Sequence, residues 1–265
     1  MRHLWGDWEN IQGRIRQARN IFLLLDYDGT LTPIVSRPEL ALCPPEVRRL
    51  LEDLRDFPHV DLAVISGRAL EDIREKVGIS GITYIGNHGL SIQNPVGVHK
   101  KRLSPLRQKE FDKIRQAAER SLGSIPGILF EDKGLILAVH YRNVARESIG
   151  GIRQVLDKII ERWKDGWQVA SGKMVLEIRP QIEFDKGKVV QAILKAFSME
   201  GFLPIFLGDD RTDEDAFRVV KKRGITVHVG PGGDDSEAEY YLQDPSEVEV
   251  FLRRFAERLR LPPKG

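Results

Sequence analysis

The stretch Ile21-Phe-Leu-Leu-Leu-Asp26-Tyr-Asp-Gly29-Thr30 decides the fold. Its apolar run ends abruptly at Asp26, and a short run without alternation is typical of a strand buried on both faces of a parallel sheet. Similar runs lie at 60–65, 82–85, 204–207 and 226–229. Between them, apolar residues at helical spacing predict helices that begin near 45, 70, 186, 213 and 246. We therefore expect an α/β fold: a doubly wound, mainly parallel sheet with helices on both faces.

The pattern changes between residues 92 and 181. Pro95 and Pro105 interrupt it, and apolar spacing then predicts two helices and three strands. The helices are expected near 107–122 and 144–164, and the strands near 134–141, 167–170 and 174–179. These elements suffice for a small α/β layer of their own. We therefore expect a sheet domain formed by residues 1–91 and 182–265, interrupted by a smaller inserted α/β domain at 92–181.

Composition and charge describe an ordinary globular protein. Hydrophobic residues make up 41% of the chain, and its 41 basic and 39 acidic residues leave a net charge of +2. This charge gives no overall field that would attract nucleic acid or an anionic membrane. The chain has one cysteine, Cys43, no apolar leader and no apolar run of membrane-spanning length. We therefore expect a cytoplasmic protein with no disulfide, no membrane and no nucleic-acid partner.

Two acidic clusters follow strands at the expected carboxyl edge of the sheet. Asp26 and Asp28 follow the first strand, and Asp209, Asp210 and Asp213 follow a late one. Converging carboxylates repel one another unless a hard cation lies between them, and oxygen ligands favour Mg²⁺. The alternative is that these residues cap helices and form turns, which would suffice for either cluster alone. Taken together, the two clusters favour a Mg²⁺ site.

Four further residues suit a phosphate. The backbone amides of Gly29 and Thr30 are expected to face an anion, and the Ser66 hydroxyl ends the second strand. Lys186 stands in the first turn of an expected helix, where the helix dipole disfavours a cation, so a negative ligand nearby would explain its position. The alternatives are a helix cap at Ser66 and a solvated lysine at 186.

Calcium and nucleotide loops are excluded by their spacing. An EF-hand loop beginning at Asp26 would need glycine and glutamate where the chain has Leu31 and Arg37. Neither Gly172-Lys173 nor Gly187-Lys188 is preceded by the first glycine of a Walker-A loop.

Four motifs, in order and at strand ends, resemble those of the haloacid dehalogenase superfamily. They are 26–34, Ser66-Gly67-Arg68, Lys186-Gly187 and 208–217. More narrowly, the chain is similar to the trehalose-6-phosphate phosphatase family along almost its full length. The narrower resemblance rests on the extended first motif and on Gly86-Asn87-His88-Gly89, His140-Tyr141-Arg142, Gly172-Lys173 and Glu177-Ile178-Arg179-Pro180. A single Asp-x-Asp is a weak signal, whereas four ordered motifs are specific.

The resemblance implies a catalytic core and a cap domain with defined roles. Asp26 would be the nucleophile, Asp28 the general acid and base, and Ser66 and Lys186 would hold the phosphoryl oxygens. Mg²⁺ would be held by Asp26, by the backbone carbonyl of Asp28 and by Asp209. Asp210 and Asp213 would be direct or outer ligands, and the sequence does not rank them.

The resemblance also implies substrate contacts. Thr30, Gly67 and Arg68 would lie on the phosphate side, and Asn87 and His88 near the hinge. The sugar would be contacted from the inserted cap domain by Arg142, Lys173 and Glu177. The alternative is that these three are an exposed strand-end cation, a turn lysine and a surface strand residue.

The expected function is Mg²⁺-dependent hydrolysis of trehalose 6-phosphate to trehalose and phosphate through an aspartyl-phosphate intermediate. Two alternatives stay open. One is a related phosphatase for sucrose 6-phosphate, mannosylglycerate phosphate or another sugar phosphate, and the other is a non-catalytic sugar-phosphate-binding protein. The expected partner is a small-molecule sugar phosphate, and we expect a monomer.

Overall fold

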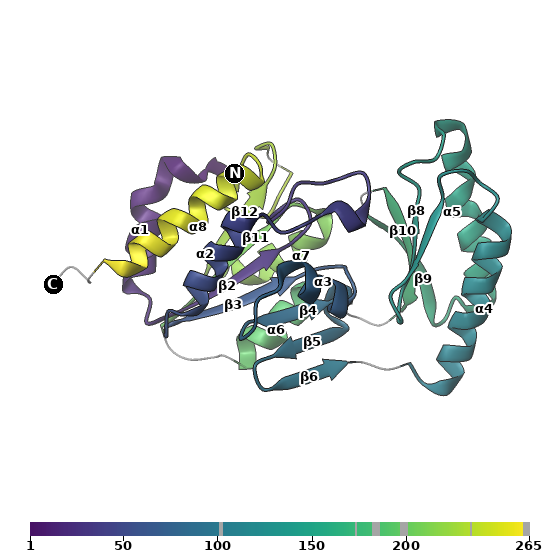
Figure 1. Ribbon diagram of the computed structural model, residues 1–265, viewed down its shortest axis with the longest axis horizontal. Helices are drawn as coiled ribbons and strands as arrows, with labels where there is room; N and C mark the ends of the chain where they lie inside the picture. The colour runs from purple at the N-terminus through teal and green to yellow at the C-terminus, as the bar shows by residue number, and fades with distance from the viewer. Residues whose placement is uncertain (101–102, 173, 182–185, 197–200, 234, 262–265) are drawn as a thin grey trace. The chain divides into compact units, whose positions relative to one another are not determined.

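The computed structural model describes residues 1–100, 103–172, 174–181, 186–196, 201–233 and 235–261 (Figure 1). The chain folds as two units. Unit 1 consists of Met1–His99 together with Phe184–Gly265, and unit 2 is Lys100–Glu183. Within the described residues, no helix combines the length and apolar character that crossing a membrane requires.

Unit 1 is built on one sheet with strand order β1-β13-β12-β11-β2-β3-β4-β5-β6. The strands are β1 (Arg2–His3), β2 (Asn20–Asp26), β3 (Val60–Ile65), β4 (Thr83–Gly86), β5 (Ser91–Asn94), β6 (Gly97–Lys100), β11 (Phe202–Gly208), β12 (Ile225–Val229) and β13 (Tyr240–Leu242). From β1 to β4 all neighbours are parallel, and β5 joins β4 antiparallel. The expected mainly parallel sheet is therefore confirmed.

Helices cover both faces of this sheet. They are α1 (Trp8–Gln17), α2 (Pro45–Arg55), α3 (Leu70–Val77), α6 (Lys186–Ala196), α7 (Glu214–Val220) and α8 (Pro245–Arg260), with 3-10 turns η1 (Leu4–Asp7), η2 (Pro38–Leu40), η3 (Asn87–Gly89) and η5 (Arg211–Asp213). Alternation along β2 separates the two cores. Leu23 and Leu25 pack in the cluster of α1, α2, α3 and α8, whereas Phe22 and Leu24 pack against α6 and α7. Because both faces are covered, residues 21–25 of β2 are all apolar, as a central parallel strand requires.

Unit 2 is a smaller two-layer α/β structure. Its strands are β7 (Leu129–Asp132), β8 (Leu137–His140), β9 (Trp167–Gly172) and β10 (Val175–Pro180), paired antiparallel in the order β7-β8-β10-β9. Its helices are α4 (Pro105–Leu122), α5 (Arg146–Ile160) and the 3-10 turn η4 (Glu161–Trp163). Leu137, Leu176 and Ile178 bury one face of the sheet against these helices. Glu177 alternates with Leu176 and Ile178, so it belongs to the other face.

Two segments differ from the sequence expectation. Strands β5 and β6 pair within the large sheet, although residues from 92 onward were expected in the insertion. Pro95 does not end the sheet there, because it lies in the turn between the two strands. In this turn Oδ1 of Asn94 accepts hydrogen bonds from the amides of Val96 and Gly97. Strand β7 was not expected at all. It is a short strand at the edge of its sheet, without a clear alternating pattern.

Candidate active site

The carboxyl edge of the unit 1 sheet gathers the motif residues of three strands. Strand β2 lies between β3 and β11, with Leu25 level with Leu207 and Asp26 level with Ile65. Ser66 therefore starts the loop next to Asp26 on one side. The acidic loop from Asp209 starts on the other side, directly after β11. Parallel pairing thus brings together residues that lie far apart in the sequence.

Three carboxylates form a compact group. One oxygen each from Asp26, Asp209 and Asp213 lies within 4.8 Å of the other two. Lys186, the first residue of α6, donates from Nζ to Oδ1 of Asp26 at 2.6 Å and to Oδ1 of Asp213 at 2.7 Å. The exposed fractions of Asp26, Lys186 and Asp213 are 5%, 3% and 0%. Charges this deeply buried are stable only when they are paired.

Burial and charge shift the pKa values of this group. Desolvation raises the pKa of Asp26 well above its usual value, and Asp213 and Asp209 raise it further, while Lys186 opposes them. Desolvation alone would lower the pKa of Lys186, but the Asp213 and Asp26 carboxylates raise it instead. Lys186 is therefore held as an ammonium ion. The raised pKa of Asp26 means that one ammonium does not offset its burial and the repulsion from the other two carboxylates. A hard divalent cation bound by this all-oxygen donor set would do so.

Glycine is required where the two acidic loops approach each other. A Cβ at Gly29 would lie 2.0 Å from Oδ2 of Asp209, and the φ of Gly29 is +88°. A Cβ at Gly208 would lie 2.4 Å from Cγ of Asp213. Both glycines thus permit the carboxylates to converge.

The turn after β2 differs in part from the expectation of two amides facing an anion. The amide of Gly29 donates to the carbonyl of Thr32 at 2.7 Å, and that of Thr30 to Tyr27 at 3.3 Å, so both are bonded within the turn. The Thr30 side chain is fully buried, and its Oγ1 has no hydrogen-bond partner among the residues that the structure describes. The hydroxyl is therefore the group of Thr30 that could meet a ligand.

The structure separates Asp210 from Asp213, which the sequence left unranked. The carboxylate of Asp210 accepts from the amide of Arg211 and caps η5, while Oδ2 of Asp213 accepts from the amide of Asp210 at 3.0 Å. Asp213 belongs to the group that could hold a metal, and Asp210 has a capping role.

Asp28 is not a member of the group of three carboxylates, and its side chain is paired with Arg68. Its Oδ2 accepts from Nε of Arg68 at 2.7 Å and its Oδ1 from Nη2 at 2.6 Å, which makes a bidentate pair. Arg68 was expected to contact substrate, and its guanidinium is here bonded to protein oxygens. A metal role for Asp28 was expected through its backbone carbonyl, which this pairing leaves unaffected.

A strained turn supports the loop after β3. Asn87 and His88 have φ angles of 52° and 53°, in the left-handed region that residues with side chains rarely adopt. The amide of Asn87 donates to the carbonyl of Arg68 at 2.7 Å, and that of His88 to Ser66 at 3.2 Å. A Cβ at Gly67 would lie 2.5 Å from the His88 ring. These five predicted site residues therefore lie together beside Asp26.

Unit 2 carries a second polar cluster on the face of its sheet opposite α4 and α5. Lys133 donates from Nζ to Oε1 of Glu177 at 2.9 Å, and their side chains are 7% and 8% exposed. Nε2 of His140 lies 2.9 Å from Oε2 of Glu131. Arg142 follows β8 and is half-buried, and Lys173 lies outside the described residues.

Sequence reasoning missed Lys133 and Glu131. The available signal was the charged run Glu131-Asp132-Lys133 directly before the turn at Gly134. A short charged run of this kind is usually a solvated loop, so it did not stand out.

The fold of this chain is the one found in haloacid dehalogenase-like hydrolases. A solved structure from Bacteroides thetaiotaomicron with that description has a TM-score of 0.65 and 15% identity, covering 89% of this chain and 99% of that one. The C-terminal domain of the trehalose-6-phosphate phosphatase of C. albicans has a TM-score of 0.78 and 23% identity, covering 94% and 96%. At these identities the similarity concerns the fold alone.

Sequence comparison narrows this class, and the chain belongs to the trehalose-phosphatase family. The family model for trehalose-phosphatase matches residues 24–246. Trehalose-phosphate phosphatase B of Arabidopsis thaliana is 35% identical over 256 residues, covering 91% of this chain and 67% of the relative. The trehalose-phosphate phosphatase of Mycobacterium tuberculosis (strain H37Rv) is 35% identical over 255 residues, covering 93% and 64%. The chain thus spans about two thirds of the length of these curated relatives. The resemblance expected from the motifs is confirmed.

Proposed function

We propose that this protein hydrolyses the phosphate ester of trehalose 6-phosphate to trehalose and inorganic phosphate. The observation that carries the proposal is the buried Lys186 between Asp26 and Asp213, at the sheet edge where Asp209 also converges. A carboxylate held by an ammonium ion and flanked by oxygen ligands is suited to attack an anionic phosphorus centre. Membership of the trehalose-phosphatase family supports the choice of substrate.

In this proposal the reaction has two halves. A carboxylate oxygen of Asp26 forms a bond to phosphorus while the bond from phosphorus to the sugar oxygen breaks, and Asp28 gives its proton to that oxygen. Asp28 then takes a proton from a water molecule whose oxygen attacks phosphorus. The bond from Asp26 to phosphorus breaks, which restores the carboxylate and releases phosphate. Lys186 stays charged throughout and offsets the repulsion between Asp26 and the phosphoryl oxygens, which Ser66 and the Thr30 hydroxyl would also contact.

Mg²⁺ is the proposed cofactor, because the donor set consists of oxygens and its members are close enough to share one small ion. Asp26, Asp209 and the Asp28 carbonyl would hold it, with Asp213 rather than Asp210 beside them. Bound Mg²⁺ supplies charge neutralisation at the phosphoryl oxygens.

Unit 2 is proposed to recognise the sugar. Sugar hydroxyls need hydrogen-bonding groups in fixed positions, and the Lys133–Glu177 pair offers such groups on a sheet rather than on a loop. Arg142 and Lys173 are proposed to join them. A monomeric, cytoplasmic protein without nucleic-acid or membrane partners remains our expectation.

Phosphate release from a panel of sugar phosphates, with and without Mg²⁺, tests the function. We expect trehalose 6-phosphate to be hydrolysed with a much higher kcat/KM than glucose 6-phosphate, sucrose 6-phosphate or mannosylglycerate phosphate. Equal rates across the panel would reject the substrate but leave a phosphatase. Ligand binding without phosphate release in the presence of Mg²⁺ would favour the non-catalytic alternative.

A further inference from the structure

We propose that Asp72 and Arg68 form a positioning pair for Asp28: Asp72 fixes the guanidinium of Arg68, and Arg68 orients the Asp28 carboxylate for proton transfer. The inference rests on the proposed acid and base role of Asp28. It gives Arg68 a task other than the substrate contact expected from sequence.

The first observation is the geometry of the Arg68–Asp28 pair. Two separate nitrogens of one planar guanidinium reach the two oxygens of Asp28, at 2.7 and 2.6 Å. A bidentate fork of this kind fixes the plane of the carboxylate as well as its position. The Arg68 side chain is 9% exposed, whereas that of Asp28 is 35% exposed. The partly exposed carboxylate is thus held by a buried guanidinium, and its accessible part can meet a substrate.

The second observation is that every nitrogen of the Arg68 guanidinium donates to a protein oxygen. Nη1 donates to Oδ2 of Asp72 at 2.8 Å, and Nη2 also donates to the carbonyl of Pro38 at 3.0 Å. The guanidinium carbon lies 5.5 Å from the centroid of the Tyr27 ring. A guanidinium with this many protein partners is suited to hold a protein group in place. If it bound a phosphate instead, several of these hydrogen bonds would have to break.

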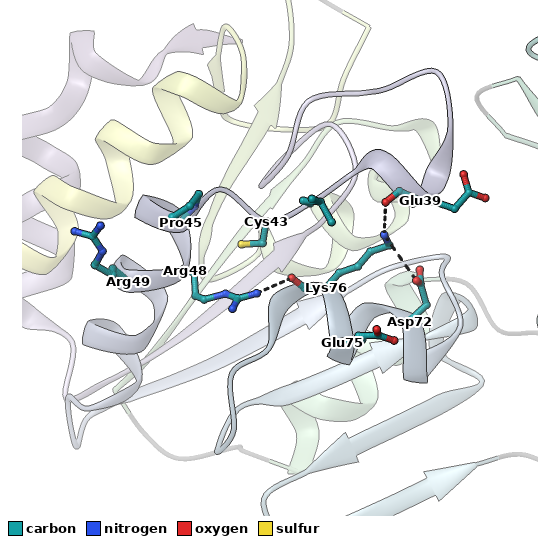
Figure 2. A pocket seen from close by; sticks show the side chains of 9 residues that line it. Glu39, Cys43, Pro45, Arg48, Arg49, Asp72, Glu75 and Lys76 are labelled. Atoms are coloured by element: carbon teal, nitrogen blue, oxygen red, sulfur yellow. Dashed lines mark hydrogen bonds and ion pairs between the residues drawn. The ribbon is translucent and has the colours of Figure 1, made fainter.

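Asp72 is itself anchored from a second direction. It lies in the first turn of α3, and Nζ of Lys76 is 3.9 Å from its Oδ1 and donates to the carbonyl of Glu39 at 3.1 Å. Figure 2 shows the Lys76 ammonium between the Glu39 carbonyl and the Asp72 carboxylate. These three residues help to line a cavity of about 680 Å³. Asp72 thus links α3 and the loop at η2 to Arg68, and through Arg68 to Asp28.

Asp72 could also serve only to stabilise α3. An acidic residue in the first turn of a helix stabilises that helix through its dipole, whatever else it contacts. A third possibility is that Arg68 binds the phosphate directly, as expected from sequence. The three roles are the positioning of Asp28, the stabilisation of α3 and the binding of phosphate by Arg68. They differ in how the activity lost on mutation depends on the leaving group of the substrate. A sugar oxygen needs a proton from Asp28 in order to leave, whereas p-nitrophenolate leaves as an anion without one.

The experiment compares kcat/KM for two substrates with Mg²⁺ present: p-nitrophenyl phosphate, and the sugar phosphate that wild-type protein hydrolyses fastest. The ratio kcat/KM reports the phosphate-transfer half, in which the leaving group departs. For Asp72→Asn we expect a loss of about tenfold to a hundredfold with the sugar phosphate and less than about threefold with the aryl phosphate. Arg68→Lys, which keeps the charge and loses the fork, should give the same split. Glu75→Gln removes an exposed carboxylate from the same helix and serves as the control, expected to leave both values unchanged.

Equal losses on both substrates in Arg68→Lys would place Arg68 on the phosphate and overturn the proposal. Equal small losses together with a lowered melting temperature in Asp72→Asn would reduce Asp72 to a helix-stabilising residue. If Asp72→Asn does not fold, Arg68→Lys alone decides. Failure of the proposed function looks different, because wild-type protein would then prefer another sugar phosphate or release no phosphate from either substrate.

Discussion

Each unit of this protein buries a lysine against a carboxylate, and the two pairs are built in different ways. In unit 1 the carboxyl ends of parallel strands and a helix start deliver Lys186 to a group of three carboxylates, so negative charge is in excess. In unit 2 Lys133 and Glu177 face each other on an antiparallel sheet, and His140 adds a further basic group beside Glu131. The excess negative charge of the first site fits the proposed divalent cation, which would in turn offset the repulsion of an anionic substrate. The more balanced second site suits neutral hydroxyl groups.

The largest effect is expected from replacing the proposed nucleophile of the first site, Asp26. Asp26→Asn removes the attacking charge at nearly constant volume, so phosphate release should fall more than about a thousandfold. Circular dichroism should show an unchanged fold, because Lys186 keeps its bond to Asp213. Activity within a few-fold of wild type would show that Asp26 is not the nucleophile.

The next largest effect is expected from metal removal, which should act on the site in unit 1. Treatment with EDTA should abolish phosphate release, and Mg²⁺ should restore it. The more direct measurement is a thermal shift without substrate. Mg²⁺ at about a hundred times its Kd should stabilise wild-type protein by about 2.7 kcal/mol, and Asp209→Asn should remove most of that effect. Stabilisation of equal size in Asp209→Asn would place the ion elsewhere.

Breaking the Lys133–Glu177 pair in unit 2 should lower the activity toward one substrate more than toward another, without abolishing catalysis. Glu177→Gln removes one of the carboxylates beside the buried Lys133 and leaves Glu131 at 4.0 Å, which should destabilise the protein by about 2 kcal/mol. Hydrolysis of trehalose 6-phosphate should fall at least tenfold more than hydrolysis of p-nitrophenyl phosphate, measured by kcat/KM. Glu161→Gln, at an exposed position of the same unit, is the control. Parallel losses on both substrates would mean that Glu177 does not contact the sugar.

The smallest expected effect is a titration confined to unit 1. Burial raises the pKa of the Cys43 thiol to about 11, whereas an unfolded chain titrates near its ordinary 9.0. Below pH 9 both states hold the proton and the shift has no effect. Above it the unfolded state loses the proton first, so stability should fall by up to about 2 kcal/mol between pH 9 and 11. Urea unfolding of wild type and Cys43→Ser across this range measures the effect, and identical slopes would contradict it.

The sequence predicted much of the first site because its geometry follows from local rules. An apolar run ending in Asp26 and another ending before Asp209 indicate parallel central strands, and such strands end at a common edge. The glycines at 29 and 208 agree with that approach.

Contacts that depend on long-range pairing were not predictable in this way. The Lys133–Glu177 pair needs the antiparallel register of β7, β8 and β10, which no local pattern specifies. The partnership of Arg68 with Asp28 and Asp72 depends on the path of a long side chain. The position of β5 and β6 in the large sheet was not predicted, because Pro95 was taken to interrupt the pattern of the sheet domain.

The turn at Asn87 and His88 sets a limit on how this protein could be made more robust. Holding side chains in the left-handed region costs on the order of 1 kcal/mol or more per residue, and glycine at either position would remove that cost. Glycine at 88 would also delete the ring that packs over Gly67, and so loosen the loop carrying Ser66. Thermal stability and turnover therefore compete at position 88, where selection on melting temperature alone would favour a glycine that weakens the support of the Ser66 loop.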